Sequence, residues 1–325
     1  MTQLAGVTKL RQTLPRFALR REYILLAVLV IEVLVLAQLS PGFLTFSNLF
    51  QTAQFFTESG LIAFGMTLII IAGGIDLSVG SLLALSSVAI GFGYQAGLPL
   101  PLAILFGIAV ATLGGVINGT LIAYWGLAPL TVTLGTFAAF RGIALAITGG
   151  DAVSSFPEWF AYIGQYFFGG IIPGQLLVFA IGAGVVALIL SRGTYGRRLY
   201  GLGLNEVTAY FSGVNTRRTK FMTYLLTGVA VGIAAVIYTS RVSTARGNAG
   251  FGLELTVIAA VVLGGANVRG GGGTISGTML GVLILALLQN GLLLAGLSTP
   301  LIQVFTGVTL LVAVFLNEFF RNNER

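Results

Sequence analysis

Long apolar runs dominate this chain and limit what it can fold into. A membrane-spanning α-helix needs roughly 20 apolar residues to cross a hydrocarbon core of ~30 Å. The runs do not alternate polar with apolar residues, which indicates buried helices and not the strands of a barrel. The predicted fold class is therefore all-α, a polytopic transmembrane helical bundle of about ten spans with interrupted helices. The predicted spans lie near residues 23–40, 57–73, 76–95, 100–125, 128–148, 174–191, 220–240, 252–266, 273–296 and 300–318.

Basic residues predict how the bundle is oriented. They precede the first run, crowd one polar loop and recur at the end of the chain. Short loops rich in Lys and Arg stay on the cytoplasmic side of a membrane. We therefore expect both termini to be cytoplasmic, which requires an even number of spans. The predicted domains are a basic cytoplasmic segment at 1–22, one membrane domain at 23–320 that contains the cytoplasmic loop 192–220, and a cytoplasmic tail at 321–325.

Two features of the sequence compete with this topology. A cleaved signal peptide is the alternative for the N-terminus, but Glu32 interrupts its apolar region, which favours an uncleaved first span. Arg241 and Arg246 are exceptions to the charge rule, because the predicted topology places them outside.

A glycine-rich stretch with one carboxylate interrupts the apolar sequence, because Ala72 to Ser81 reads A-G-G-I-D-L-S-V-G-S. Backbone groups freed by such a break are tolerated at membrane depth only where protein or a water-filled cavity satisfies them. We predict that Asp76 accepts hydrogen bonds from free N–H groups at the start of the next helix; the alternative is that Asp76 contacts a solute directly. The candidate pathway and gating residues are Gly73, Gly74, Asp76, Ser78, Gly80 and Asn267.

Asn267 is a candidate because the pattern recurs later in the chain. When residues 68–81 are laid on 259–272, Asp76 meets Asn267 and both segments carry a Gly-Gly pair. Paired interruptions in two halves of a chain are typical of a transporter pathway. The alternative is chance, since the chain holds 46 glycines. Because the predicted spans give both segments one orientation, we expect a parallel repeat.

The residues that the chain lacks exclude several chemistries. It has no cysteine and no histidine, which removes thiolate chemistry and the commonest metal ligand. Neither Lys9 nor Lys220 follows a glycine, so no P-loop is present and ATP-driven work would need another subunit. An enzyme, a cofactor and a metal are not expected. The net charge of +7 is interpreted as topology, so no nucleic-acid partner is expected either.

The polar loop at 192–220 contains capping residues that predict a short helix. Asn205 can cap a short helix that runs to Phe211, and Gly213 can end it. One interpretation is a solvated loop that only sets topology. The other is a helix that docks in a groove on a cytoplasmic partner.

Several motifs together resemble a known family. Gly65-Met66-Thr67, Gly73 to Ser81, Asn118-Gly119, Thr133 to Thr136 and Arg141-Gly142 are similar to the membrane subunit of bacterial ABC importers of the ribose/galactose/xylose type. The resemblance continues through the loop at 196–215 and through Val262 to Asn267, and covers roughly residues 20–320. Leu263 to Asn267 and Gln289 to Leu292 look most similar to permeases for autoinducer-2 and rhamnose-like sugars.

The resemblance implies a bacterial inner-membrane permease that works with partners. Two permease subunits, of the same or different chains, would form a pore in the membrane lipid. Cytoplasmic ATP-binding subunits would grip the loops, and a periplasmic or lipid-anchored solute-binding protein would deliver a sugar. An interior poor in ionisable groups favours a neutral polar solute. The implied ATPase-coupling residues are Gly196, Asn205, Glu206, Ala209 and Gly213.

The resemblance places Arg141 in the span that follows Thr133 to Thr136. We predict a structural buried charge with a carboxylate or carbonyl partner, and Asp151 and Asp76 are the candidate carboxylates. The alternative is that the side chain extends to the membrane surface.

Other transporter classes remain open at this point. A branched-chain amino-acid ABC permease is the rival within the importer class, and a proton- or sodium-driven secondary carrier would also explain the repeat and Asp76. A scaffolding membrane protein would not need a carboxylate at depth.

Overall fold

The computed structural model describes residues 21–170 and 172–323. The predicted basic segment at 1–22 lies almost entirely outside these residues, as does the end of the tail predicted at 321–325. The helices are α1 (Arg21–Leu39), α2 (Phe46–Ile71), α3 (Val79–Gln95), α4 (Leu100–Ala123), α5 (Pro129–Thr148), α6 (Glu158–Gln165), α7 (Gln175–Ser191), α8 (Thr194–Leu204), α9 (Glu206–Phe211), α10 (Thr216–Val242), α11 (Leu253–Leu263), α12 (Ile275–Leu294) and α13 (Thr299–Asn323). The strands are β1 (Ala152–Val153), β2 (Phe167–Phe168), β3 (Ile172–Pro173) and β4 (Ala245–Arg246).

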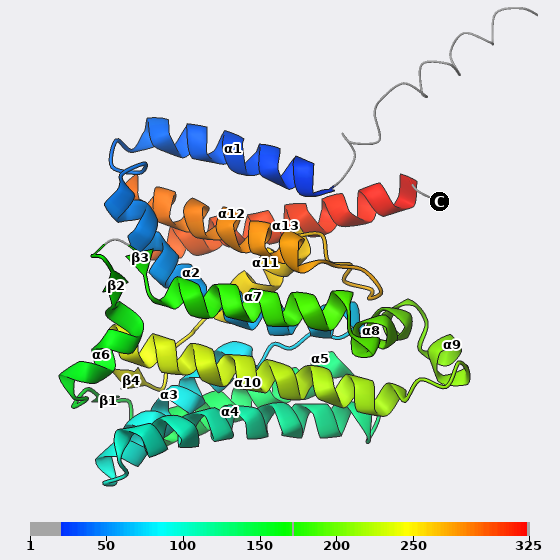
Figure 1. Ribbon diagram of the computed structural model, residues 1–325, viewed down its shortest axis with the longest axis horizontal. Helices are drawn as coiled ribbons and strands as arrows, with labels where there is room; N and C mark the ends of the chain where they lie inside the picture. Colours follow the sequence, from blue (N-terminus) through cyan, green and yellow to red (C-terminus); the bar gives the residue numbers. More distant parts are fainter. Residues whose placement is uncertain (1–20, 171, 324–325) are drawn as a thin grey trace, which may run out of the picture.

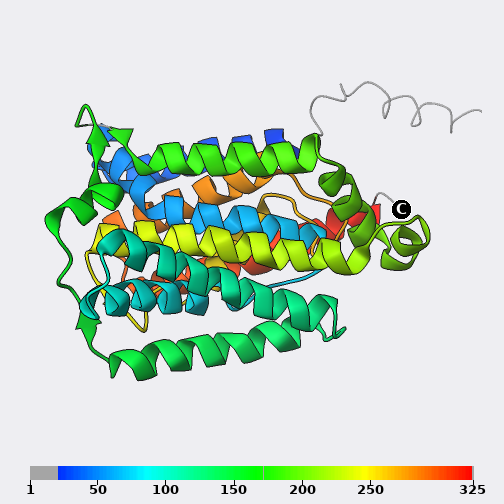
Figure 2. The ribbon, with the colours of Figure 1, turned by 60° about the horizontal axis from the view of Figure 1, so that its bottom comes forward.

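The helices lie side by side along one axis, and the short elements gather at the two ends of the bundle (Figure 1). One end carries α8 and α9 and is called the α8/α9 end. The other carries α6 and the strands, where β1 pairs with β4 and β2 with β3, and is called the β end. The described chain starts and finishes at the α8/α9 end (Figure 1). Figure 2 shows α5 along one edge of the bundle, far from α7 at the opposite edge.

The helices agree with the predicted class but not with a simple count of spans. Six of the described helices are long and apolar enough to cross a membrane, or seven if α7 and α8, bent by 71°, form one broken span. α3, α11 and the apolar part of α13 are shorter. With 11 residues, α11 is only about 16 Å long. An all-α polytopic bundle is confirmed, and the ten predicted spans are not confirmed.

The centre of the bundle is α2, which is mostly buried and packs against α7, α10, α11 and α12. It begins at Phe46, well before the span predicted at 57–73, because Thr45 caps it by accepting from the Asn48 N–H. Asn48 there donates to the Asn290 side chain on α12 at 2.9 Å. Side-chain pairing across helices thus extends α2 beyond its apolar run.

The two halves of the chain are related by an inverted repeat. α3 packs against α4, α5 and α10, and α11 packs correspondingly against α12, α13 and α2. α2 runs toward the α8/α9 end, whereas α10 runs away from it (Figure 1). The elements α2 to α5 therefore correspond to α10 to α13 in the opposite direction, an arrangement common in transporters.

This correspondence replaces the parallel repeat predicted from 68–81 and 259–272. Those segments look alike because each ends a helix with a left-handed glycine, Gly73 with φ 82° and Gly265 with φ 91°. The predicted alignment is also off by one residue, because it pairs Gly73 with Gly264 and not with the left-handed Gly265. A shared helix-ending motif, and not a shared place in a repeat, produced the likeness.

Candidate functional site

The break after α2 is made by two glycines with different tasks. Gly73 adopts φ 82°, and its N–H donates to the Ile70 carbonyl at 2.9 Å, which closes the helix. The N–H of Gly74 donates to the Ile69 carbonyl at 2.9 Å. A Cβ at Gly74 would lie 2.7 Å from the Tyr224 hydroxyl, so a side chain there would disturb α10. The chain then turns back into the bundle and starts α3 at Val79.

Asp76 lies in this return segment and is almost fully buried, with 2% of its surface exposed. Its Oδ1 accepts from the Ser78 N–H at 2.8 Å and from the Ser78 hydroxyl at 2.6 Å. The Asn118 amide of α4 donates to Ser78 Oγ at 2.9 Å and lies 3.4 Å from Asp76 Oδ2. The Ser81 hydroxyl donates to the Ser78 carbonyl at 2.8 Å.

These contacts modify the predicted capping role. Asp76 accepts from Ser78, the residue before the first helical one, and not from the N–H groups of the first turn of α3. The carboxylate therefore fixes the conformation of residues 76–78, just before α3. Two polar atoms beside it, Asn118 Oδ1 and the Tyr224 hydroxyl, are buried and have no hydrogen-bond partner within the described residues.

Gly80 allows α3 and α11 to meet inside the bundle. A Cβ at Gly80 would lie 2.5 Å from the Gly250 carbonyl oxygen and would also strike the Glu254 carboxylate. Gly250 and Glu254 flank the start of α11, so the N-terminal ends of two oppositely directed helices come together here. The sequence predicted Gly80 as part of a break, and it did not predict Glu254 as its neighbour.

Asn267 does not join the Asp76 cluster. It lies in the loop 264–273 at the α8/α9 end, where its Oδ1 accepts from the Arg269 N–H at 3.0 Å and its N–H donates to the Gly272 carbonyl at 2.9 Å. The Asn267 side chain therefore orders a turn. The loop does, however, contact the break after α2, because the Gly271 N–H donates to the Ile71 carbonyl at 2.9 Å.

Helix α8 packs against the end of α2 and against the loop that follows α11. A Cβ at Gly203 would strike the Ile71 carbonyl and the Gly271 N–H, so the backbone of α8 touches the end of α2 and the loop 264–273 directly. The Tyr200 hydroxyl donates to the Gly273 carbonyl at 2.7 Å. Neither residue was predicted, since one glycine or tyrosine in a polar loop gives no signal by itself.

The predicted short helix in this loop is confirmed as α9. Asn205 caps it, with its Oδ1 accepting from the Thr208 N–H at 2.9 Å, and Gly213 follows it with φ 81°. Ala209 is the buried residue of α9 itself. Glu206 pairs with Lys220 Nζ at 2.6 Å at the surface. Gly196 lets α8 start against α7, because a Cβ there would strike the Leu190 carbonyl.

Arg141 has carbonyl partners. Its Nη1 donates to the carbonyls of Gly247 at 2.9 Å and Ala249 at 2.6 Å, in the segment between β4 and α11. Among the described residues, Arg141 makes no hydrogen bond or ion pair with Asp151 or Asp76, so both predicted carboxylate partners are wrong. Carbonyls reach the guanidinium because the segment 247–250 returns into the bundle beside α5.

Arg241, one of the two exceptions to the charge rule, is neutralised by an ion pair. Arg241 pairs with Glu58 of α2 through Nε to Oε1 at 2.7 Å and Nη2 to Oε2 at 3.1 Å, and both side chains are largely buried. A two-point pair of this kind is strong and directional. Arg241 therefore does not count as a free positive charge at the β end.

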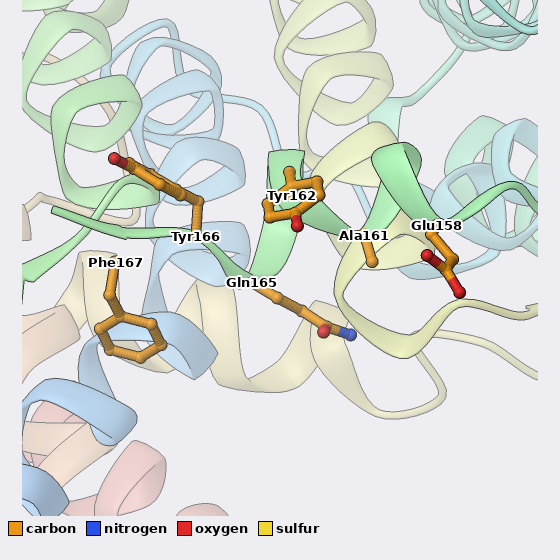
Figure 3. A pocket seen from close by; sticks show the side chains of 6 residues that line it. All are labelled: Glu158, Ala161, Tyr162, Gln165, Tyr166 and Phe167. Carbon is orange, nitrogen blue, oxygen red and sulfur yellow. The ribbon is translucent and has the colours of Figure 1, made fainter. Parts of the chain in front are cut away.

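An open pocket lies at the same end, on α6 and β2. It has a volume of 390 Å³ and is lined by Glu158, Ala161, Tyr162, Gln165, Tyr166 and Phe167 (Figure 3). Figure 3 shows Tyr166 and Phe167 on one side of Gln165 and Glu158 on the other. The pocket thus combines aromatic surface with a carboxylate.

Comparison with known proteins identifies the family. Residues 48–314 match the family described as "Branched-chain amino acid transport system / permease component". The chain is similar to the ribose import permease protein RbsC of Bacillus subtilis, with 40% identity over 292 residues that cover 89% of this chain and 90% of that protein.

It is also similar to autoinducer 2 import system permease proteins LsrD. That of Klebsiella pneumoniae is 36% identical over 305 residues, covering 92% of each chain, and that of Salmonella typhimurium is 35% identical over 299 residues, covering 90% of each. The resemblance to permeases of the ribose type is thereby confirmed. Since the match spans most of its length, the chain belongs to the branched-chain amino acid transport system / permease component family.

Proposed function

We propose that the chain is the permease subunit of an ATP-driven, binding-protein-dependent importer of a sugar or sugar-like polar solute. The relatives named for ribose and autoinducer 2 support the solute class. The observation that carries the mechanism is the contact of α8 with the end of α2 and with the loop 264–273, because it joins the polar loop to the break that holds Asp76. A motion of α8 would move the break directly.

The α8/α9 end faces the cytoplasm in this proposal, and the membrane is the bacterial inner membrane. Arg192, Arg197, Arg198, Arg217 and Arg218 lie at or beside α8 and α9, which fits cytoplasmic loops. Both described chain ends lie on the same side (Figure 1). The pairing of Arg241 with Glu58 removes one of the two exceptions to this orientation.

ATP-binding subunits dock on α9. Leu204, Val207, Tyr210 and Phe211 expose apolar surface there, and Phe211 is 82% exposed. Exposed apolar side chains gathered on a polar, basic end favour an interaction site. Glu206 already forms an ion pair with Lys220 of the same chain. We therefore assign the main docking contacts to the apolar residues and a smaller contribution to Glu206.

The remaining partners occupy the other surfaces. A solute-binding protein docks at the β end, where the pocket of Figure 3 opens. A second permease subunit covers the side that carries α5 and α13, where Leu134, Val304 and Val308 are exposed. Two such subunits enclose the pathway between them.

The solute class and the energy source can be tested in one preparation. Proteoliposomes that contain the permease, its ATP-binding subunits and its solute-binding protein are loaded with ATP and supplied with labelled D-ribose, autoinducer 2 or L-leucine. We expect ATP-dependent uptake of a sugar or sugar-like solute. Uptake of L-leucine alone would support an amino-acid permease, and uptake driven by a proton or sodium gradient without ATP would contradict the mechanism.

The docking surface is tested separately by replacing Phe211 with Ala. We expect the ATP-binding subunits to be lost from the purified complex, while the permease still inserts. Phe46→Ala is the matched control, because Phe46 is equally exposed on α2 at the β end. Retention of the ATP-binding subunits by Phe211→Ala would remove α9 from the docking site.

A further inference from the structure

A second polar cluster lies where α3 packs against α5 and α11. Arg141 of α5 uses only Nη1 in hydrogen bonds, and its Nε and Nη2 are buried without a partner among the described residues. Glu254 of α11 is 8% exposed, and its Oε2 is likewise buried without a partner there. Unpaired groups of this kind are costly and need an explanation.

The two charges do not cancel by direct contact. Arg141 and Glu254 lie within electrostatic range of each other, but the described ion pairs join Lys220 to Glu206 and Arg241 to Glu58. The guanidinium therefore keeps N–H donors unused, and the nearby carboxylate keeps an acceptor unused. A molecule placed between them would satisfy both without adding charge.

An aromatic side chain lies beside the Arg141 guanidinium. Phe251 is 71% exposed, and its ring centroid lies 6.0 Å from the Arg141 guanidinium carbon. It stands between Gly250 with φ 62° and Gly252 with φ 80°, two left-handed positions that only glycine adopts without strain. The backbone on either side of Phe251 is thus suited to move the ring over Arg141 or away from it.

The combination fits one class of ligand. A sugar ring offers hydroxyl groups that accept from N–H donors and donate to a carboxylate, and an apolar C–H face that packs on an aromatic ring. The pair carries no net charge, so it does not select a charged solute. The α-carboxylate and α-ammonium of an amino acid could pair with the same two groups, so the choice of a sugar rests on the proposed function.

We propose that Arg141, Glu254 and Phe251 form a transit site for a neutral polyhydroxylated solute on the translocation pathway. The inference rests on the proposed function and adds to it the residues that meet the solute inside the membrane. In the closed arrangement the free atoms are shielded. Displacement of Phe251 about Gly250 and Gly252 exposes them to the arriving solute.

The absence of cysteine from the chain allows a direct test of occupancy. Phe251→Cys is prepared in the permease assembled with its ATP-binding subunits, and its modification by a methanethiosulfonate is timed with and without D-ribose. We expect D-ribose to slow modification severalfold. L-leucine should have no effect. The control is Phe46→Cys, at an exposed position on α2 at the β end, where D-ribose should not change the rate.

A second variant shows whether protection depends on the polar pair. In Phe251→Cys/Glu254→Gln we expect the protection by D-ribose to be lost, because the amide no longer supplies a charged acceptor. If D-ribose leaves the rate of methanethiosulfonate modification of Phe251→Cys unchanged while the wild-type complex imports labelled D-ribose, the transit site is overturned and the proposed function stands. A wild-type complex that imports no sugar would overturn the proposed function, and the transit site with it.

Discussion

At the residue scale, one carboxylate and its two neighbours hold the break after α2. Asp76 satisfies the Ser78 N–H and hydroxyl, and Asn118 satisfies Ser78 in turn. In a medium without water, these bonds replace the helical bonds that the break gives up. We expect the acceptor oxygen of Asp76 to matter more in this arrangement than its charge.

Replacing Asp76 separates those two properties. Asp76→Asn keeps an oxygen in place of Oδ1, and we expect a stable protein with much of its transport. Asp76→Ala loses two hydrogen bonds to a charged acceptor, each worth about 1.5–3 kcal/mol, and should lower thermal stability in detergent and abolish uptake. A stable but inactive Asp76→Asn protein would show instead that the pathway requires the charge.

Gly80 tests the meeting of α3 and α11. Gly80→Ala places a methyl group against the Gly250 carbonyl and the Glu254 carboxylate, so we expect a loss of about 1–3 kcal/mol in stability. The matched control is Gly184→Ala in α7, where a Cβ meets nothing within 4 Å. That variant should be neutral or gain up to ~1 kcal/mol in helix propensity. Equal melting temperatures for both variants would contradict the close approach.

At the element scale, the sequence predicts features that depend on local chemistry. It gives α9 with its Asn205 cap and the glycine after it, and it gives the break at Gly73, because caps and left-handed glycines act within a few residues. It does not give the partners of Arg141 or the place of Asn267. Those depend on where the segments 247–250 and 264–273 return in space, which no local pattern encodes.

Helix α8 is the element that links the polar loop to the break, and two of its glycines form a matched pair. Gly203 has no room for a Cβ, because the Ile71 carbonyl and the Gly271 N–H lie against it, whereas Gly201 faces open space. We expect Gly203→Ala to lower uptake by about tenfold or more, the effect of a 1.4 kcal/mol change in coupling. Gly201→Ala should transport normally. Similar uptake rates for the two variants would show that α8 does not act through this contact.

At the scale of the whole molecule, the inverted repeat explains why two helix starts meet inside the bundle. Each half contributes one long helix, one return segment and one shorter helix, and the halves run in opposite directions. The sequence contains two glycine-rich breaks, but the alignment predicted from them paired segments that do not correspond in the repeat. Inverted halves have similar helix packing without similar residues. The long helices of the two halves, α2 and α10, pack against each other.

The ion pair between Glu58 of α2 and Arg241 of α10 ties these two long helices together near the β end. Removing one partner leaves a buried charge alone, and we expect Glu58→Gln to cost about 3–5 kcal/mol. Replacing both, as in Glu58→Leu/Arg241→Met, leaves no charge and should be nearly neutral in thermal stability. The measurement is the melting temperature of the purified permease in detergent. If the double variant is as unstable as the single one, the pair holds α2 and α10 together by its own attraction; if it recovers, the pair fixes how the two halves are aligned while apolar packing supplies the stability.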